Sequence, residues 1–157
     1  MEYAFVVILF LALLFGIAGF GHALFVYHHL NHASREATRY ASVRGSNCAN
    51  DLSCTSGNSA SGISGATTVA DVQQFVKNLT PPSIDTNQLV ITVCGVSDTT
   101  VGTACTNGEP PVCTAATPNK PGCTVTVTVA YPYAFVFPLV RLAPVSMSST
   151  SETVIVN

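Results

Sequence analysis

Charge is the scarcest property of this sequence. Only 9% of its 157 residues are Asp, Glu, Lys or Arg, and Trp is absent. A typical soluble domain carries about a quarter charged residues, so an ordinary cytosolic enzyme is not expected. The net charge of -2 excludes the basic footprint of nucleic-acid-binding proteins, and no nucleic-acid partner is expected.

The motifs of common enzymes are missing as well. The sequence contains no Gly-x-Ser-x-Gly, no P-loop and no His-Glu-x-x-His motif. All four histidines lie between residues 22 and 32, so the remainder of the chain has no His to act as a general base. We therefore expect no enzymatic activity, no catalytic residue and no cofactor.

The residues that are present divide unevenly. No charged residue occurs between Tyr3 and Ser34, and residues 3–27 form an apolar run whose only strongly polar member is His22. As a helix this run would be roughly 37 Å long, enough to cross a hydrocarbon core of about 30 Å. It is also longer than the apolar core of a signal peptide, about 7–15 residues. The sequence predicts a membrane-spanning helix that continues to about residue 44.

Phenylalanine recurs every five residues along this helix, and each step turns the ring by roughly 140°. The five rings belong to Phe5, Phe10, Phe15, Phe20 and Phe25. They point all round the axis, whereas a helix on one soluble core has a one-sided apolar stripe. Two interpretations stay open: a plain membrane anchor, or a helix that exchanges lipid for copies of itself. Gly16, Gly19 and Gly21 would allow a second helix to approach closely.

Two signals disagree about the compartment. Arg35, Arg39 and Arg44 follow the apolar run, which by the positive-inside rule would place the later residues in the cytoplasm. Six cysteines in a Ser/Thr-rich region instead indicate disulfides and an oxidising compartment. The conflict disappears if a basic leader once preceded Met1 and has been removed, which we adopt as a hypothesis.

Residues 46–157 are predicted to form a separate head, after an N-terminal helical domain of residues 1–45. An amphipathic helix is expected over 66–78, capped by Thr67 or Thr68. Strands are expected over 88–96, 123–131 and 146–156, and in the second of these Val alternates with Thr. The predicted fold class is therefore α+β: a long apolar helix and a small head with one helix and an antiparallel sheet of about three or four strands.

Disulfides are expected to staple this small head. If the first two strands pair antiparallel with Cys94 opposite Cys123, Val90 faces Val127. The predicted bonds, chosen from fifteen possible pairings, are Cys48–Cys54, Cys94–Cys123 and Cys105–Cys113.

Two further motifs are candidates for a metal site and a glycosylation site. His28 and His32 lie four residues apart on one helical face, a spacing that can bind a metal. No Cys or carboxylate joins them on that face, so a polar interface or a contact between subunits is preferred and no metal site is predicted. Asn78-Leu79-Thr80 matches an N-glycosylation acceptor, which makes Asn78 a candidate; an unmodified head is the alternative.

Several motifs together resemble the TadE-like family, pilin-like proteins of the tight-adherence (Tad) branch of type IV pilus systems. They are the acidic-aromatic pair Glu2-Tyr3, the glycine-aromatic pairs Phe15-Gly16 and Phe20-Gly21, the segment from Ala33 to Gly45, and the closing SMSSTSETVIV. The resemblance implies a prepilin that a membrane peptidase cleaves after a short basic leader. It further implies storage in the bacterial inner membrane and export to the cell surface by a pilus assembly machinery.

Three functions remain open under this resemblance: a major filament subunit that polymerises through its N-terminal helix, a minor pseudopilin that initiates or caps another filament, and a single-pass anchored adhesion or binding domain. In a filament, a Glu2 carboxylate among apolar helices would need the α-ammonium group of an adjacent copy, which would set the axial register. The residues expected to serve assembly and register are Glu2, Tyr3, Phe5, Phe10, Gly16, Gly19, Phe20 and Gly21. At the other end of the helix, Arg35, Glu36 and Arg39 are expected to contribute.

Overall fold

The fold combines one long helix, one short helix and a three-stranded antiparallel sheet. The computed structural model describes residues 2–45, 67–96, 121–135 and 143–156. The elements are α1 (Glu2–Val43), α2 (Val69–Leu79), β1 (Val90–Cys94), β2 (Thr124–Tyr133) and β3 (Val145–Val154). The sheet has the order β1-β2-β3. The expected α+β class and its long N-terminal helix are confirmed.

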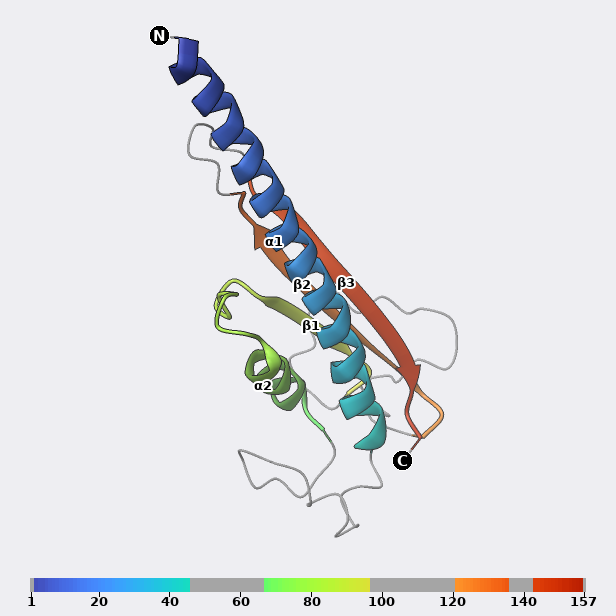
Figure 1. Ribbon diagram of the computed structural model, residues 1–157. Helices are drawn as coiled ribbons and strands as arrows, with labels where there is room; N and C mark the ends of the chain where they lie inside the picture. Colours follow the sequence, from blue (N-terminus) through green and yellow to red (C-terminus); the bar gives the residue numbers. More distant parts are fainter. Residues whose placement is uncertain (1, 46–66, 97–120, 136–142, 157) are drawn as a thin grey trace.

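Helix α1 has two halves with different surroundings. Its 42 residues give a length of roughly 63 Å, and only its C-terminal half lies along the sheet (Figure 1). In that half a buried residue recurs every three or four positions: Ala23, Val26, Leu30, Ala33, Ala37 and Ala41. Alanine at three successive turns lets the helix axis approach the sheet closely, and α1 contacts β2, β3 and α2.

Polar groups also cross the contact between α1 and β3. The Ser149 hydroxyl donates to Asn31 Oδ1 at 2.7 Å and lies 3.0 Å from the Ser34 hydroxyl. Ser34, Ser149 and Thr38 are all buried, and the Thr38 hydroxyl donates to the Ser34 carbonyl. Because a buried polar group is costly without a partner, these bonds favour one stagger of the helix against the strand.

The register between β1 and β2 differs from the expectation. Val90 lies opposite Ala130 and Cys94 opposite Thr126, so the predicted pairing of Val90 with Val127 and of Cys94 with Cys123 is wrong. The predicted register is offset by an odd number of residues, which would turn the buried side chains of β1 toward the outward-facing threonines of β2. In the observed register Val93 lies opposite Val127, and both are buried.

The Val/Thr alternation of β2 is confirmed. Val125, Val127 and Val129 are fully buried, while Thr124, Thr126 and Thr128 occupy the other face. Strand β3 pairs with β2 over ten residues, from Thr124 with Val154 to Tyr133 with Val145. After β3, the Val156 N–H donates to the Ser42 carbonyl, which joins the C-terminal end of the chain to the end of α1.

Helix α2 begins three residues later than expected, at Val69. Thr68 is its N-cap, and the Thr68 hydroxyl and the Asp71 carboxylate form a capping box. Val72 and Val76 are fully buried on its inner face, and the helix ends at Leu79, before Pro81. The prolines end this helix as predicted, because the residue before a proline disfavours helical geometry.

Candidate membrane-anchoring and assembly helix

Residues 3–22, which we call the exposed half of α1, extend beyond the sheet (Figure 1). Their large apolar side chains are between 43% and 88% exposed, from Leu11 to Tyr3. The four phenylalanines in this half are exposed although they point in different directions, and Phe25, just beyond it, is exposed as well. The all-round apolar surface expected from the five-residue spacing is confirmed. α1 is the one helix in the described part of the chain that is long and apolar enough to cross a membrane.

The head begins to cover the helix within the apolar run. Ala23 is 6% exposed and Val26 is fully buried, so the predicted span of residues 3–27 overlaps the head by about one turn. The exposed half contains 20 residues, or roughly 30 Å of helix, which matches the hydrocarbon thickness of a bilayer. A membrane would therefore be spanned by residues 3–22.

A hydrogen-bonded cluster lies at the boundary between the exposed half of α1 and the head. The Tyr133 hydroxyl, at the end of β2, donates to the Gly19 carbonyl at 3.1 Å and lies 3.1 Å from His22 Nδ1. Because the only hydroxyl hydrogen goes to Gly19, His22 Nδ1–H is the donor in the second bond. Phe135 stands edge-on to Tyr133, with 4.9 Å between ring centroids, and a Cβ atom at Gly19 would lie 3.9 Å from its ring. His22, the one strongly polar residue of the apolar run, is thus hydrogen-bonded to the head.

Sequence reasoning missed this cluster. The sequence shows His22 as the polar exception of the apolar run and aromatic residues after the Val/Thr strand, but 111 positions separate His22 from Tyr133. Only the packing of β2 along α1 brings them together.

Residues 1–39 match the TadE-like protein family. The matched stretch, which we call the TadE-like segment, is 39 of the 157 residues and contains the whole exposed half of α1. The resemblance inferred from the sequence is confirmed over this segment. No curated protein and no solved structure matches the chain.

The TadE-like segment carries every residue predicted to serve assembly. Tyr3, Phe5, Phe10 and Phe20 are exposed and apolar. A Cβ atom at Gly16 or Gly21 would meet nothing within 4 Å, whereas one at Gly19 would meet Phe135 at 3.9 Å. Gly16 and Gly21 are therefore open to an external partner, while the head already occupies the side of Gly19. Glu2 is the first residue of α1, its side chain lies outside the described structure, and its role in register stays a prediction.

The histidines of the TadE-like segment do not form a metal site within the described residues. His28 and His32 are exposed, and no group of three or more His, Cys, Asp or Glu side chains gathers there or elsewhere in that part of the chain. His29, between them, has a buried Nε2 atom, and burial together with the neighbouring His32 lowers the pKa of its ring.

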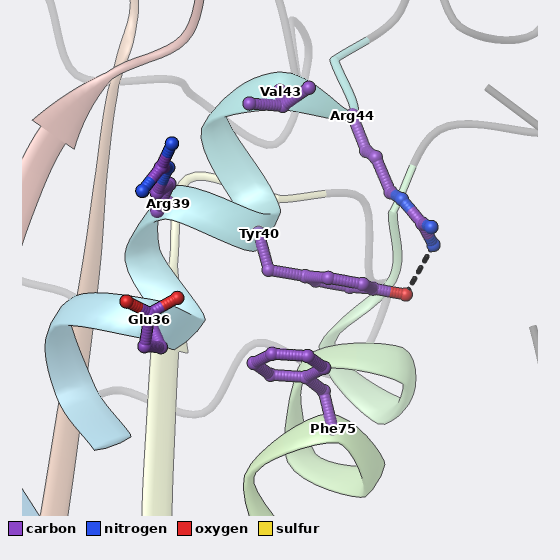
Figure 2. Close-up of a pocket in the computed structure, with 6 residues that line it drawn as sticks. All are labelled: Glu36, Arg39, Tyr40, Val43, Arg44 and Phe75. Atoms are coloured by element: carbon purple, nitrogen blue, oxygen red, sulfur yellow. Dashed lines mark hydrogen bonds between the residues drawn. The ribbon is translucent and has the colours of Figure 1, made fainter. Parts of the chain in front are cut away.

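A groove of about 250 Å³ opens at the far end of α1, where it meets α2 (Figure 2). The Tyr40 ring stacks on Phe75 with 4.4 Å between centroids, and the Arg44 guanidinium lies over the other face of Tyr40 at 4.2 Å. Burial raises the pKa of Tyr40; Arg44 opposes this rise and Asp71 adds to it. The stack joins the two helices, and Glu36 and Arg39 line the groove beside it. Their expected part in subunit register stays a prediction.

The disulfide framework is corrected in one respect. Cys94 is disulfide-bonded, but not to the buried Cys123, so the predicted Cys94–Cys123 bond is wrong. The shifted register explains this, because it places Thr126 and not Cys123 opposite Cys94. Cys48, Cys54, Cys105 and Cys113 lie outside the described residues, and their pairing stays a prediction.

The candidate glycosylation site lies on α2. Asn78 is exposed near the end of this helix, and its Oδ1 accepts a hydrogen bond from Gln74 Nε2 at 2.9 Å. Modification of Asn78 stays a prediction.

Proposed function

We propose that this chain is a structural, non-enzymatic subunit of a type IV pilus-like filament of the Tad branch. In this proposal the exposed half of α1 holds the subunit in the bacterial inner membrane and then packs among copies of itself in a filament at the cell surface. The observation that carries it is the exposed half itself: apolar on all sides, covered by its own head only beside Gly19 and His22, and contained in the TadE-like segment.

The exchange of lipid for protein is energetically feasible for such a helix. Lipid tails and apolar side chains are about equally apolar, so association in a membrane depends on close packing and on polar groups, not on hydrophobicity. Gly16 and Gly21 have open space where a neighbouring helix would pack. The helix can therefore leave lipid without exposing apolar surface to water.

The head suits the outside of a filament. The sheet face turned away from α1 carries hydroxyl groups, and Thr128 and Thr150 are hydrogen-bonded across it at 2.9 Å. Such a surface is soluble with little charge, so neighbouring heads would not repel one another strongly. A head-to-tail contact between copies does not close on itself and therefore grows as a helical polymer.

The passage from the inner membrane to a surface filament implies partner proteins. A prepilin peptidase would remove a leader, and the pilus assembly machinery would extract the subunit from the inner membrane. Both belong to the proposal, as does the homo-oligomeric state.

Photo-crosslinking tests polymerisation directly. A benzoyl-phenylalanine at Phe10, in the exposed half of α1, is expected to give a ladder of covalent multimers in filaments sheared from cells. The same probe at Lys77, exposed on α2, serves as the control for chance contacts between heads. A ladder from Phe10 with this chain dominating the sheared fraction supports a major subunit. Crosslinks to a more abundant protein would indicate a minor pseudopilin, and monomers alone would indicate an anchored domain and contradict polymerisation.

A further inference from the structure

The C-terminal end of β2 and the N-terminal end of β3 reach the exposed half of α1, so this end of the sheet would lie at the bilayer surface. Phe135 lies beside Gly19, and Val145 pairs with Tyr133 at the same end of the sheet. Gly19 is 16 residues from Tyr3, or roughly 24 Å along the helix. If residues 3–22 cross a hydrocarbon core of about 30 Å, Gly19 lies within its outer edge.

We propose that Tyr133, Phe135 and Val145, together the interfacial cluster, enter the headgroup region of the bilayer beside α1. The head is then seated on the membrane surface and not suspended above it. The inference rests on the membrane-anchored state in the proposed function and adds to it the surface of the head that contacts lipid. Phe135 and Val145 make this surface, because Tyr133 is itself buried.

The chemistry of the cluster fits this location. Tyrosine and other aromatic side chains concentrate at membrane interfaces, where the ring lies in an apolar layer and the polar group finds a partner. Tyr133 uses its hydroxyl for Gly19 and His22, so neither this hydroxyl nor His22 Nδ1 would face hydrocarbon without a hydrogen bond. Val145 is 48% exposed although it is apolar, which suits contact with lipid.

Charge is absent from this end of the described molecule. Residues 131–135 and 143–147 contain no charged side chain. On α1 the next charged residue after Glu2 is Arg35, roughly 24 Å beyond Gly19. On β3 the charged residue is Glu152, opposite Thr126, which is about 23 Å along β2 from Tyr133. The described ends of β2 and β3 beside Gly19, residues 131–135 and 143–147, are thus uncharged.

The absence of Trp from the chain allows a clean test with single Trp probes. The full chain would be reconstituted in phosphatidylethanolamine–phosphatidylglycerol vesicles that contain lipids brominated either near the headgroup or near the chain ends. Phe10→Trp reports the middle of the span, and Phe135→Trp reports the interfacial cluster. Val145→Trp is a second probe at the same end, in case the larger ring disturbs Phe135. Val156→Trp, 73% exposed and joined to the far end of α1, is the control outside the membrane.

The expected result is graded quenching. Phe10→Trp should lose most emission with deep bromines, Phe135→Trp and Val145→Trp should lose most with shallow bromines, and Val156→Trp should lose none. If Phe10→Trp is quenched while both cluster probes behave like Val156→Trp, the inference is overturned and the anchor stands. If Phe10→Trp is not quenched, the membrane span of the proposed function fails.

Two other outcomes also overturn the inference. A blue-shifted Phe135→Trp emission that neither lipid quenches would show that protein, such as a second copy of this chain, covers the cluster. Quenching of Val156→Trp along with the others would show that the whole head lies on the bilayer, not its hairpin end alone.

Discussion

The hydroxyl groups of Ser34 and Ser149 lie 3.0 Å apart in the buried contact between α1 and β3. The two residues are 115 positions apart in the chain, and Asn31 completes the network by accepting from Ser149. Because the surrounding face of α1 is largely alanine, shape alone distinguishes poorly between neighbouring staggers of the helix. The hydrogen bonds favour one stagger, and that stagger determines how much of α1 extends beyond the head.

Replacing Ser149 is expected to destabilise the head. Ser149→Ala removes the donor to Asn31 Oδ1 and one of two partners of the Ser34 hydroxyl, which keeps its bond to the Asn31 carbonyl. Leaving Asn31 Oδ1 without this donor in a partly buried place costs about 1–3 kcal/mol. Urea unfolding of the full chain in detergent micelles, followed by circular dichroism, measures the loss. Ser148→Ala, on the exposed side of the same strand, is the matched control and should change the free energy of unfolding by less than about 0.5 kcal/mol.

A double-mutant cycle isolates the bond itself. Ser34→Ala combined with Ser149→Ala should cost less than the sum of the single changes, by about 0.5–3 kcal/mol, because the first change has already removed the bond between the two hydroxyls. Strictly additive losses would show that the two hydroxyls do not interact.

The turn after β1 gives a second prediction about stability. Gly95 has φ +93°, and a Cβ atom there would lie 2.5 Å from the Thr124 carbonyl oxygen. Gly122 has a similar φ of +88°, but a Cβ atom would meet nothing within 4 Å. Ala at either position carries the left-handed backbone cost of about 1–2 kcal/mol. Gly95→Ala should lose about 1–3 kcal/mol more than Gly122→Ala, since the strands must also separate. Equal losses in urea unfolding would contradict the close approach of Gly95 to β2.

Local patterns predicted the elements of this fold well. The charge-free run, the Val/Thr alternation of β2 and the cap at Thr68 each depend on neighbouring residues, and each is visible in the sequence. The register of β1 on β2 was wrong because the cysteines suggested one pairing, whereas the buried faces of Ile91 and Val93 require another.

The boundary of the candidate site could not be predicted for a related reason. Residues 3–27 are uniformly apolar, and nothing in them distinguishes a side chain that faces lipid from one that faces the head. Ala23 and Val26 are buried only because β2 and β3 lie along α1. The same packing brings Tyr133 to His22.

A substitution at Gly16 is expected to change assembly of the subunits without changing the stability of the single subunit. A side chain at Gly16 meets nothing in the chain itself, so Gly16→Leu should leave the fold and membrane insertion intact. Packing between copies would be overfilled at a cost of about 1–3 kcal/mol, or roughly 10–100-fold in association. Carbonate extraction measures insertion, and the amount of sheared filament measures assembly. Ile17→Leu, at an exposed neighbouring position with the same side-chain volume, is the control. Normal filament yield from Gly16→Leu would show that this face of α1 does not pack against another helix.

Glu2 provides the corresponding test of register. Glu2 is the first residue of α1 and precedes an apolar run, so in the proposed filament its carboxylate would be surrounded by apolar helices. A charge in such a place needs a partner, and the proposed partner is the α-ammonium group of an adjacent copy. Removing one member of a buried pair costs about 3–5 kcal/mol, so Glu2→Gln should weaken association more than about 100-fold. In the membrane the same residue lies at the end of the span, so carbonate extraction should be unchanged.

The control for Glu2→Gln is Glu152→Gln, which makes the same chemical change on the exposed face of β3. Glu152 lies on the head, so its neutralisation should leave filament yield near the parent value. If Glu2→Gln assembles as well as Glu152→Gln, the carboxylate does not set the register, and packing at Gly16 and Gly21 must do so. If both variants fail to assemble, charge acts through the head surface, and the pairing proposed for Glu2 is wrong.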